Sequence, residues 1–79
     1  MTHKNDFVSY SAIDWKSARD SRGYSQREVA ELAGITPSAY YHLEKGYNEP
    51  RLSTIVWVAG ALNAEIVIRN GECTINLLE

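Results

Sequence analysis

The segment SQREVAELAGITPSAYYHLEKG, residues Ser25–Gly46, contains two helix starts only eleven residues apart. Its first four residues, ending at Glu28, have the pattern of a capping box, in which a serine hydroxyl and a glutamate three residues later each accept a backbone N–H. Thr36 followed by Pro37 gives the second start, with a cap residue and then a proline at the first helical position. Gly34 lies between the two and suits a tight turn. The segment therefore predicts two short helices joined by a sharp corner.

Further helices are predicted on both sides of this segment. Upstream, Ser11 and Asp14 have the spacing of another capping pattern, which predicts a helix from there to about Arg22. Downstream, a fourth helix is predicted from Arg51 to about Asn63, because apolar residues recur there at three- and four-residue spacing. The positions expected to face the core are Leu52, Ile55, Val56, Ala59 and Leu62.

The last part of the chain changes from a helical to an alternating period. Asn70 and Gly71 form a two-residue turn signal between two strand-like runs, residues 65–69 and 72–77. Pairing across this turn sets Ile68 opposite Cys73, and the pattern predicts a β-hairpin with one apolar face. That face consists of Ile66, Ile68, Cys73, Ile75 and Leu77.

Together these signals predict a mainly α protein, in which four helices are followed by a C-terminal β-hairpin. Residues 1–8 are polar and have no periodic apolar face, so they are predicted to form a mobile arm. Residues 9–63 would form the helical domain and residues 64–79 the hairpin.

Composition limits the classes of protein that fit. The chain has 79 residues, of which 44% are hydrophobic and 23% charged, as is typical of one small globular domain. Its longest nearly apolar run, residues 55–62, is far shorter than the roughly 20 residues of a membrane-spanning helix. The single cysteine cannot form an intrachain disulfide, and the chain does not start with a signal-peptide pattern, so a cytoplasmic location is favoured.

The sequence also lacks the patterns of catalysis and of metal binding. Two histidines and one cysteine give no metal-ligand spacing, and no glycine-rich phosphate loop or nucleophile–base arrangement occurs. Cys73 is interpreted as a small buried hydrophobic residue. The chain is predicted not to be an enzyme and to use neither a cofactor nor a metal.

Two short helices joined by a glycine-containing turn are the geometry that places a second helix in the major groove of DNA. The segment from residue 25 to 46 resembles the lambda repressor and Cro-like helix-turn-helix family, also called the XRE family, and the resemblance extends over about residues 11–63. The chain departs from the family at Tyr40, where a smaller aliphatic residue is usual, and at Pro37 and Ala39, where polar base readers are common. The residues that fall at the family's offsets, with Tyr40 matching only as an apolar residue, are Gln26, Val29, Ala30, Gly34, Thr36, Tyr40, Leu43, Glu44, Lys45 and Gly46. The resemblance implies a four-helix lambda-repressor-like DNA-binding domain.

The resemblance also implies roles for individual residues. Gln26 is expected to bond a phosphate and to steady the recognition helix, and Arg19 is expected to pair with Glu44 and fix the angle of that helix. The exposed side of the recognition helix would contact phosphates or base edges, and the loop after it would approach the sugar-phosphate backbone. The predicted DNA-binding residues are Gln26, Thr36, Pro37, Ser38, Tyr41, His42, Lys45, Tyr47, Asn48 and Arg51.

The predicted function is that of a transcriptional regulator, by resemblance a repressor. It would act as a homodimer on a pseudo-palindromic operator, with the helix that starts at Pro37 in the major groove of each half-site. The hairpin is one candidate for the dimer contact; Trp57 is another, although an edge-of-core position explains that residue equally well. The predicted dimerisation residues are Trp57, Ile66, Ile68, Ile75 and Leu77.

Two alternatives stay open at the level of sequence. A helix-turn-helix followed by a strand also resembles the antitoxin of a toxin–antitoxin pair, which would add a toxin to the partners of the chain. A protein-interaction module that kept the fold and lost DNA binding would suit the net charge of −2 and the pI of about 5.6.

Overall fold

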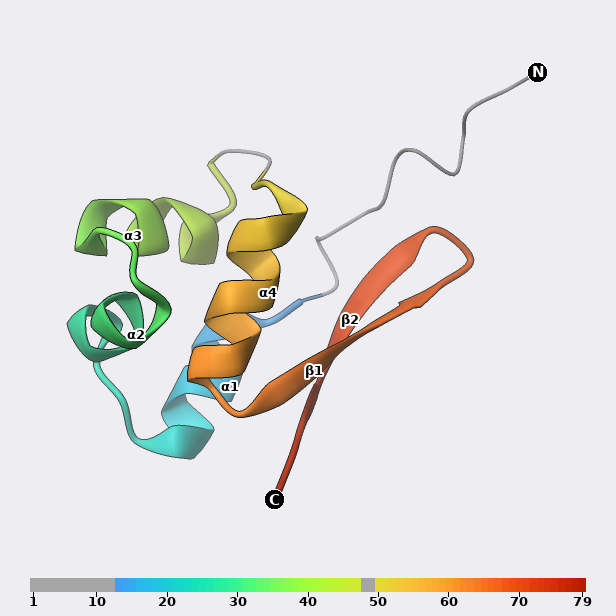
Figure 1. Cartoon of the computed structure of the whole chain (residues 1–79), viewed down its shortest axis with the longest axis horizontal. Helices are drawn as coiled ribbons and strands as arrows, with labels where there is room; N and C mark the ends of the chain where they lie inside the picture. The colour runs from blue at the N-terminus through green and yellow to red at the C-terminus, as the bar shows by residue number, and fades with distance from the viewer. Residues whose placement is uncertain (1–12, 48–49) are drawn as a thin grey trace.

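The computed structural model describes residues 13–47 and 50–79. Over these residues the chain forms four helices, α1 (Trp15–Arg22), α2 (Gln26–Ala33), α3 (Pro37–Lys45) and α4 (Leu52–Ala61), followed by strands β1 (Ala64–Arg69) and β2 (Glu72–Leu77). Figure 1 shows α2 and α3 at one end of the molecule, α4 in the middle, and the hairpin leading away on the other side. The predicted mainly α fold with a C-terminal hairpin is confirmed, whereas the predicted arm, residues 1–8, lies outside the described residues.

Both predicted helix starts in the central segment are present. Ser25 Oγ accepts the backbone N–H of Glu28 at 3.1 Å, and Glu28 Oε1 accepts the backbone N–H of Ser25 at 2.7 Å, which completes the capping box of α2. Gly34 ends α2 with a φ of +76°, in the left-handed region that favours glycine. Thr36 Oγ1 then accepts the N–H of Ala39 at 3.1 Å and caps α3.

The start of α1 was predicted wrongly. Asp14, expected inside the first turn, is the N-cap, so the helix begins at Trp15. Its carboxylate accepts the backbone N–H of Ser17 and the hydroxyl of the same residue, both at 3.0 Å, and these bonds lower the pKa of Asp14. An aspartate that caps the N–H three residues later lies outside the helix itself. Ser11, the cap predicted from the sequence, lies outside the described residues.

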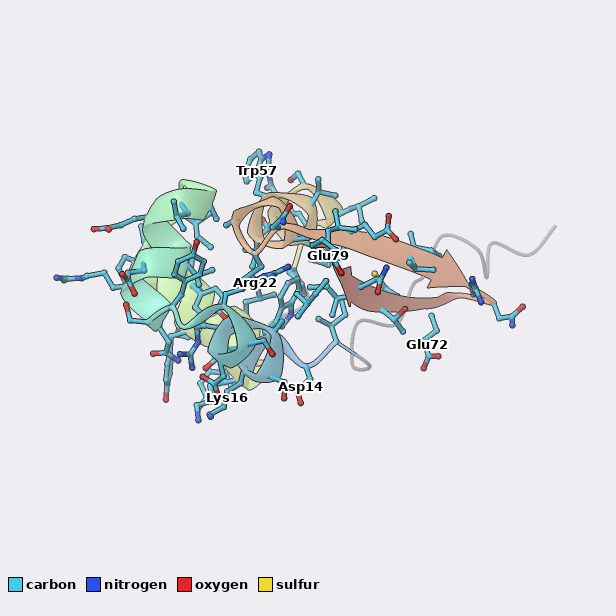
Figure 2. The ribbon with its side chains drawn as sticks, turned by 90° about the horizontal axis from the view of Figure 1, so that it is seen from below. Asp14, Lys16, Arg22, Trp57, Glu72 and Glu79 are labelled. Carbon is cyan, nitrogen blue, oxygen red and sulfur yellow. The ribbon has the colours of Figure 1, made fainter. Side chains whose placement is uncertain are left out.

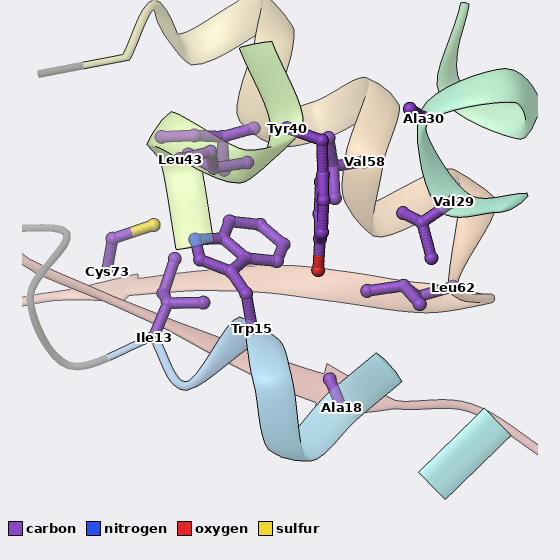
Figure 3. Packing of buried hydrophobic residues seen from close by; sticks show 11 residues of the cluster. Ile13, Trp15, Ala18, Val29, Ala30, Tyr40, Leu43, Val58, Leu62 and Cys73 are labelled. Carbon is purple, nitrogen blue, oxygen red and sulfur yellow. The ribbon is translucent and has the colours of Figure 1, made fainter. Parts of the chain in front are cut away.

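One hydrophobic core joins all four helices and the hairpin. Figure 3 shows Trp15 of α1 and Tyr40 of α3 at its centre, with side chains from the other elements around them. The buried hydrophobic residues are Ile13, Trp15, Ala18, Val29, Ala30, Tyr40, Leu43, Ile55, Val58, Ala59, Leu62 and Cys73. Because α1, α2 and α4 contribute to the same core as α3, the core positions the helix that carries the candidate site.

The buried side of α4 differs from the predicted one. Ile55, Ala59 and Leu62 are buried as expected, but Leu52 and Val56 are 49% and 51% exposed, and Val58 is buried instead. The helix contains apolar residues all round, so its sequence does not distinguish strongly between neighbouring faces.

The hairpin has the predicted register, with Ile66 opposite Ile75 and Ile68 opposite Cys73. Asn70 and Gly71 both have positive φ, 53° and 76°, as a two-residue type I′ turn requires. Most of the apolar face covers the helices of the same chain: Cys73 is buried, and Ile66, Ile75 and Leu77 pack against the core. Burial also raises the pKa of the Cys73 thiol, in keeping with its predicted role as a hydrophobic residue. Ile68 is the exception in this face, because it is 49% exposed.

Arg22, at the end of α1, holds the base of the hairpin. Its Nε donates to the carbonyl of Leu62 at 2.8 Å, and its Nη2 donates to the carbonyls of Asn63 at 2.9 Å and of Leu78. Asn63 also accepts the N–H of Leu78 at 2.9 Å and donates its side-chain amide to the main-chain oxygen of Glu79 at 3.0 Å. Figure 2 shows Arg22 reaching from α1 towards this point. We call this arrangement the Arg22 clamp.

Candidate nucleic-acid interface

The inner side of α3 is fixed by a polar network around Glu44. Arg19 donates its Nε to Glu44 Oε2 at 2.8 Å and its Nη2 to Oε1 at 3.2 Å. Gln26 Nε2 donates to Oε1 at 2.7 Å, and the Tyr40 hydroxyl donates to Oε2 at 2.8 Å. These four residues, hereafter the Glu44 network, tie α1 and α2 to α3 and so set the orientation of α3.

The Glu44 network is largely shielded from water. The side chains of Arg19 and Glu44 are 12% and 6% exposed, and their paired N–H···O contacts form a two-point, charge-assisted bond. Burial by itself disfavours the carboxylate, but the hydrogen bonds from Arg19, Tyr40 and Gln26 outweigh it and lower the pKa of Glu44. Glu44 is therefore ionised at neutral pH, and both of its oxygens are occupied.

The structure contains the contact between Arg19 and Glu44 that the resemblance implied, and it adds the bonds from Gln26 and Tyr40 to Glu44, which were not predicted. The Tyr40 hydroxyl was not foreseen as part of a polar network, although Tyr40 and Glu44 stand four residues apart on one helix and so face the same side. Burial, followed by the bond to Glu44, raises the pKa of Tyr40 well above its ordinary value. Tyr40, which stands where the family usually has an aliphatic residue, thus supplies an additional donor to the network.

The outer side of α3 presents hydrogen-bonding groups to solvent. Ser38, Tyr41 and Lys45 are exposed and His42 is partly exposed, and the four lie on the side opposite Tyr40 and Leu43. We call these four residues the reading face. Hydroxyl, phenol, imidazole and ammonium groups can all hydrogen-bond phosphates or base edges, and an aromatic ring can contact a thymine methyl group.

Tyr47, in the loop after α3, extends the reading face with a third ring. Its ring centroid lies 6.1 Å from that of Tyr41 and 5.7 Å from that of His42, and the Tyr41 and His42 rings are 6.1 Å apart. Lys45 Nζ lies 5.7 Å from the centre of the Tyr41 ring, within the range of a cation–π contact. The three rings and the ammonium group therefore form one cluster on this side of α3.

The other predicted contact residues lie around the reading face. Thr36 and Pro37 are exposed at the start of α3, where the Thr36 hydroxyl oxygen is already used as a cap. Arg51 is exposed and forms the N-cap residue of α4. Asn48 lies outside the described residues.

Two further findings concern the described residues, 13–47 and 50–79. No group of three or more His, Cys, Asp or Glu side chains among them could hold a metal ion. None of the helices in this part of the chain is long and apolar enough to cross a membrane.

A capped α2, a glycine turn and an α3 with polar groups on its free side define a helix-turn-helix domain. Residues 16–67, more than half of the chain, match the helix-turn-helix family, and the chain belongs to that family. It is 35% identical over 68 residues to the uncharacterized HTH-type transcriptional regulator y4dL of Sinorhizobium fredii, covering 86% of this chain and 33% of that protein.

A second relative is the SPbeta prophage-derived uncharacterized HTH-type transcriptional regulator YonR of Bacillus subtilis. The chain is 40% identical to it over 47 residues, which cover 60% of this chain and 44% of YonR. The matches thus span about a third of one relative and less than half of the other. Both relatives are named as transcriptional regulators of the helix-turn-helix type.

Proposed function

We propose that the chain binds double-stranded DNA as a homodimer, with α3 of each copy in the major groove of one half of a pseudo-palindromic operator, and that it represses transcription in the cytoplasm. The observation that carries this proposal is the division of α3 into two sides. The Glu44 network fixes one side against α1 and α2, and the reading face on the other side has hydrogen-bonding groups that are free to meet DNA.

In this proposal the reading face contacts base edges and the ends of α3 contact the sugar-phosphate backbone. Tyr41 and His42 would read bases, while Lys45 and Arg51 would neutralise phosphates. The Gln26 side-chain amide has two N–H donors, and its contact with Glu44 uses one of them. The other would donate to a phosphate. The remaining proposed contacts are Thr36, Pro37, Ser38, Tyr47 and Asn48.

The acidic balance of the chain supports a dimer as the binding form. With eight Lys and Arg against ten Asp and Glu, one copy offers few phosphate contacts. Two linked copies gain affinity because the second half-site is bound in an effectively intramolecular step. The proposed dimerisation residues are Trp57 and the hairpin residues Ile66, Ile68, Ile75 and Leu77, of which Trp57 and Ile68 are about half-exposed in the single chain.

The test is selection from a pool of random-sequence duplexes, followed by affinity measurements on the enriched sequence at low and moderate salt. We expect an inverted-repeat motif, and we expect Tyr41→Ala and His42→Ala each to weaken binding by about tenfold or more, as the loss of a base contact does. Leu32→Ala is the matched control, because Leu32 is 58% exposed on α2 outside the reading face. Failure to enrich any motif at any salt would contradict the proposal.

A further inference from the structure

The outer side of α4 is apolar and has no partner among the described residues. The helix, LSTIVWVAGA, contains no charged residue, and its buried side is already filled by Ile55, Val58 and Ala59. On the other side Leu52, Val56 and Trp57 are 49%, 51% and 55% exposed. Figure 2 shows Trp57 at the margin of the molecule, pointing away from it. We define the α4 face as Leu52, Ser53, Val56, Trp57 and Gly60. A helix that is apolar all round is expected to be covered all round.

Gly60 gives a second, independent indication on the same face. It lies inside α4 and is exposed, and a Cβ atom added there would meet nothing within 4 Å. Glycine weakens a helix relative to alanine, and Gly60, unlike Gly34 and Gly46, does not have the positive φ of a helix end. No contact within the described chain requires its missing side chain. A flat site on a helix suits the close approach of another chain.

We infer that the α4 face binds the same face of a second copy of this chain, with the two α4 helices antiparallel about a twofold axis. Trp57 and Gly60 are three residues apart and both belong to the exposed side, so they lie about one turn apart on the helix. An axis between them places Trp57 of each copy over Gly60 of the other. A projecting ring and a flat site at this spacing make the face self-complementary, as a twofold interface requires.

The absence of charge in α4 and the direction of its dipole suit a second copy as the occupant of this face. Two chains of net charge −2 repel each other, but the absence of charged residues in α4 keeps that repulsion away from the contact. Antiparallel pairing also sets the positive end of each helix dipole, with the exposed Arg51 at the N-cap, beside the negative C-terminal end of the other helix.

The size of the face sets the expected strength of the dimer. Three half-exposed apolar side chains per copy would bury on the order of several hundred Å² in total, less than the roughly 1,200 Å² of the smaller stable complexes. The dimer should therefore be weak and reversible. The inference rests on the homodimer of the proposed function and names its contact surface, but its test contains no DNA, so a failure to bind DNA leaves its outcome unaffected.

The first experiment measures the mass of the full chain by sedimentation over a wide concentration range, without DNA. We expect the wild type to change from monomer to dimer and Trp57→Glu to stay monomeric throughout. Leu32→Glu on α2, at a position 58% exposed, is the matched control and should dimerise as the wild type does. Ile68→Glu on β1, at a position 49% exposed, tests the hairpin as the alternative contact. A wild type that stays monomeric overturns the inference. So does a result in which Ile68→Glu prevents the dimer and Trp57→Glu does not, which would assign the contact to the hairpin.

Gly60→Gln separates a lost contact from a damaged fold. In dilute, monomeric protein this variant should unfold at a higher temperature than the wild type, because glutamine favours the helix and its side chain has open space. The same variant should dimerise at least about tenfold more weakly, because the side chain occupies the site of the partner's Trp57. Dimerisation equal to that of the wild type would contradict the inference.

Discussion

Arg19 and Arg22 lie one turn apart on α1, and each fixes a different part of the molecule. Arg19 binds the carboxylate of Glu44 and so holds α3, which carries the reading face. Arg22 binds the backbone carbonyls of Leu62, Asn63 and Leu78 and so holds the base of the hairpin. The first contact joins two charges, whereas the second joins a charge to neutral groups.

This difference has consequences for how each part responds to change. The orientation of α3 depends on the ionisation of one side chain and on three donors that converge on it. The hold on the hairpin depends on main-chain groups that every residue provides, so it is insensitive to pH and to the identity of the residues that accept. α3 is therefore the part that a single side-chain substitution or a change of pH can most easily displace.

The largest effect is expected for Arg19→Met, which leaves the nearly buried Glu44 carboxylate without its ionic partner. We expect the free energy of unfolding to fall by about 3 kcal/mol, as measured by urea denaturation. Lys16→Met is the control, because Lys16 and Asp20 form an exposed pair on the same helix, 67% and 52% exposed, and removing it should cost less than about 1 kcal/mol. Equal losses in the two variants would show that the Glu44 network does not stabilise the fold.

A smaller effect is expected for Arg22→Met, because its carbonyl partners are neutral and lie partly at the surface. The loss should be about 1–2 kcal/mol. It should also be local: amide hydrogen exchange should become faster in β1 and β2 before it does in α2 and α3. If exchange becomes faster in α3 first, Arg22 does not stabilise the hairpin separately from α3 in the way that its contacts indicate.

The sequence predicts those parts of the fold that depend on neighbouring residues. The starts of α2 and α3 and the register of the hairpin follow from Ser25, Thr36 and the Asn70-Gly71 turn, each of which acts over a few residues. The start of α1 was missed because the spacing of Ser11 and Asp14 was interpreted as a capping box, whereas the Asp14 carboxylate itself caps the helix.

The remaining features depend on residues that are distant in the sequence or on weak patterns. Bonds from Arg22 to carbonyls about 40 residues later have no sequence signature, because every residue has a carbonyl group. The buried side of α4 was predicted only in part because its helix is apolar on every side, so the core selects the face. In the candidate site, the family resemblance was enough to pair Glu44 with Arg19. It did not predict the bond from Tyr40, because the family usually has an aliphatic residue at that position.

The smallest effect expected is a pH dependence confined to the Glu44 network. The pKa of Glu44 is lower in the folded chain than its ordinary value of 4.5, so in acid the unfolded chain binds more protons. The stabilisation by Glu44 should be complete above about pH 4.5 and decrease as the pH falls through the lower, folded pKa. The backbone carbonyls of Leu62, Asn63 and Leu78, which Arg22 binds, do not titrate in this range.

Glu44→Gln tests this dependence, because it keeps the shape of the side chain and removes its titration. Urea denaturation of both proteins from neutral pH into acid should show the stability difference between wild type and variant shrinking as the pH falls. Asp14, whose pKa is also lowered, is unchanged in the variant, so its contribution cancels in the difference. If the two stability curves run parallel, protonation of Glu44 does not loosen α3. The contact of Arg19 with Glu44 would then be as insensitive to pH as the contact of Arg22 with its carbonyls.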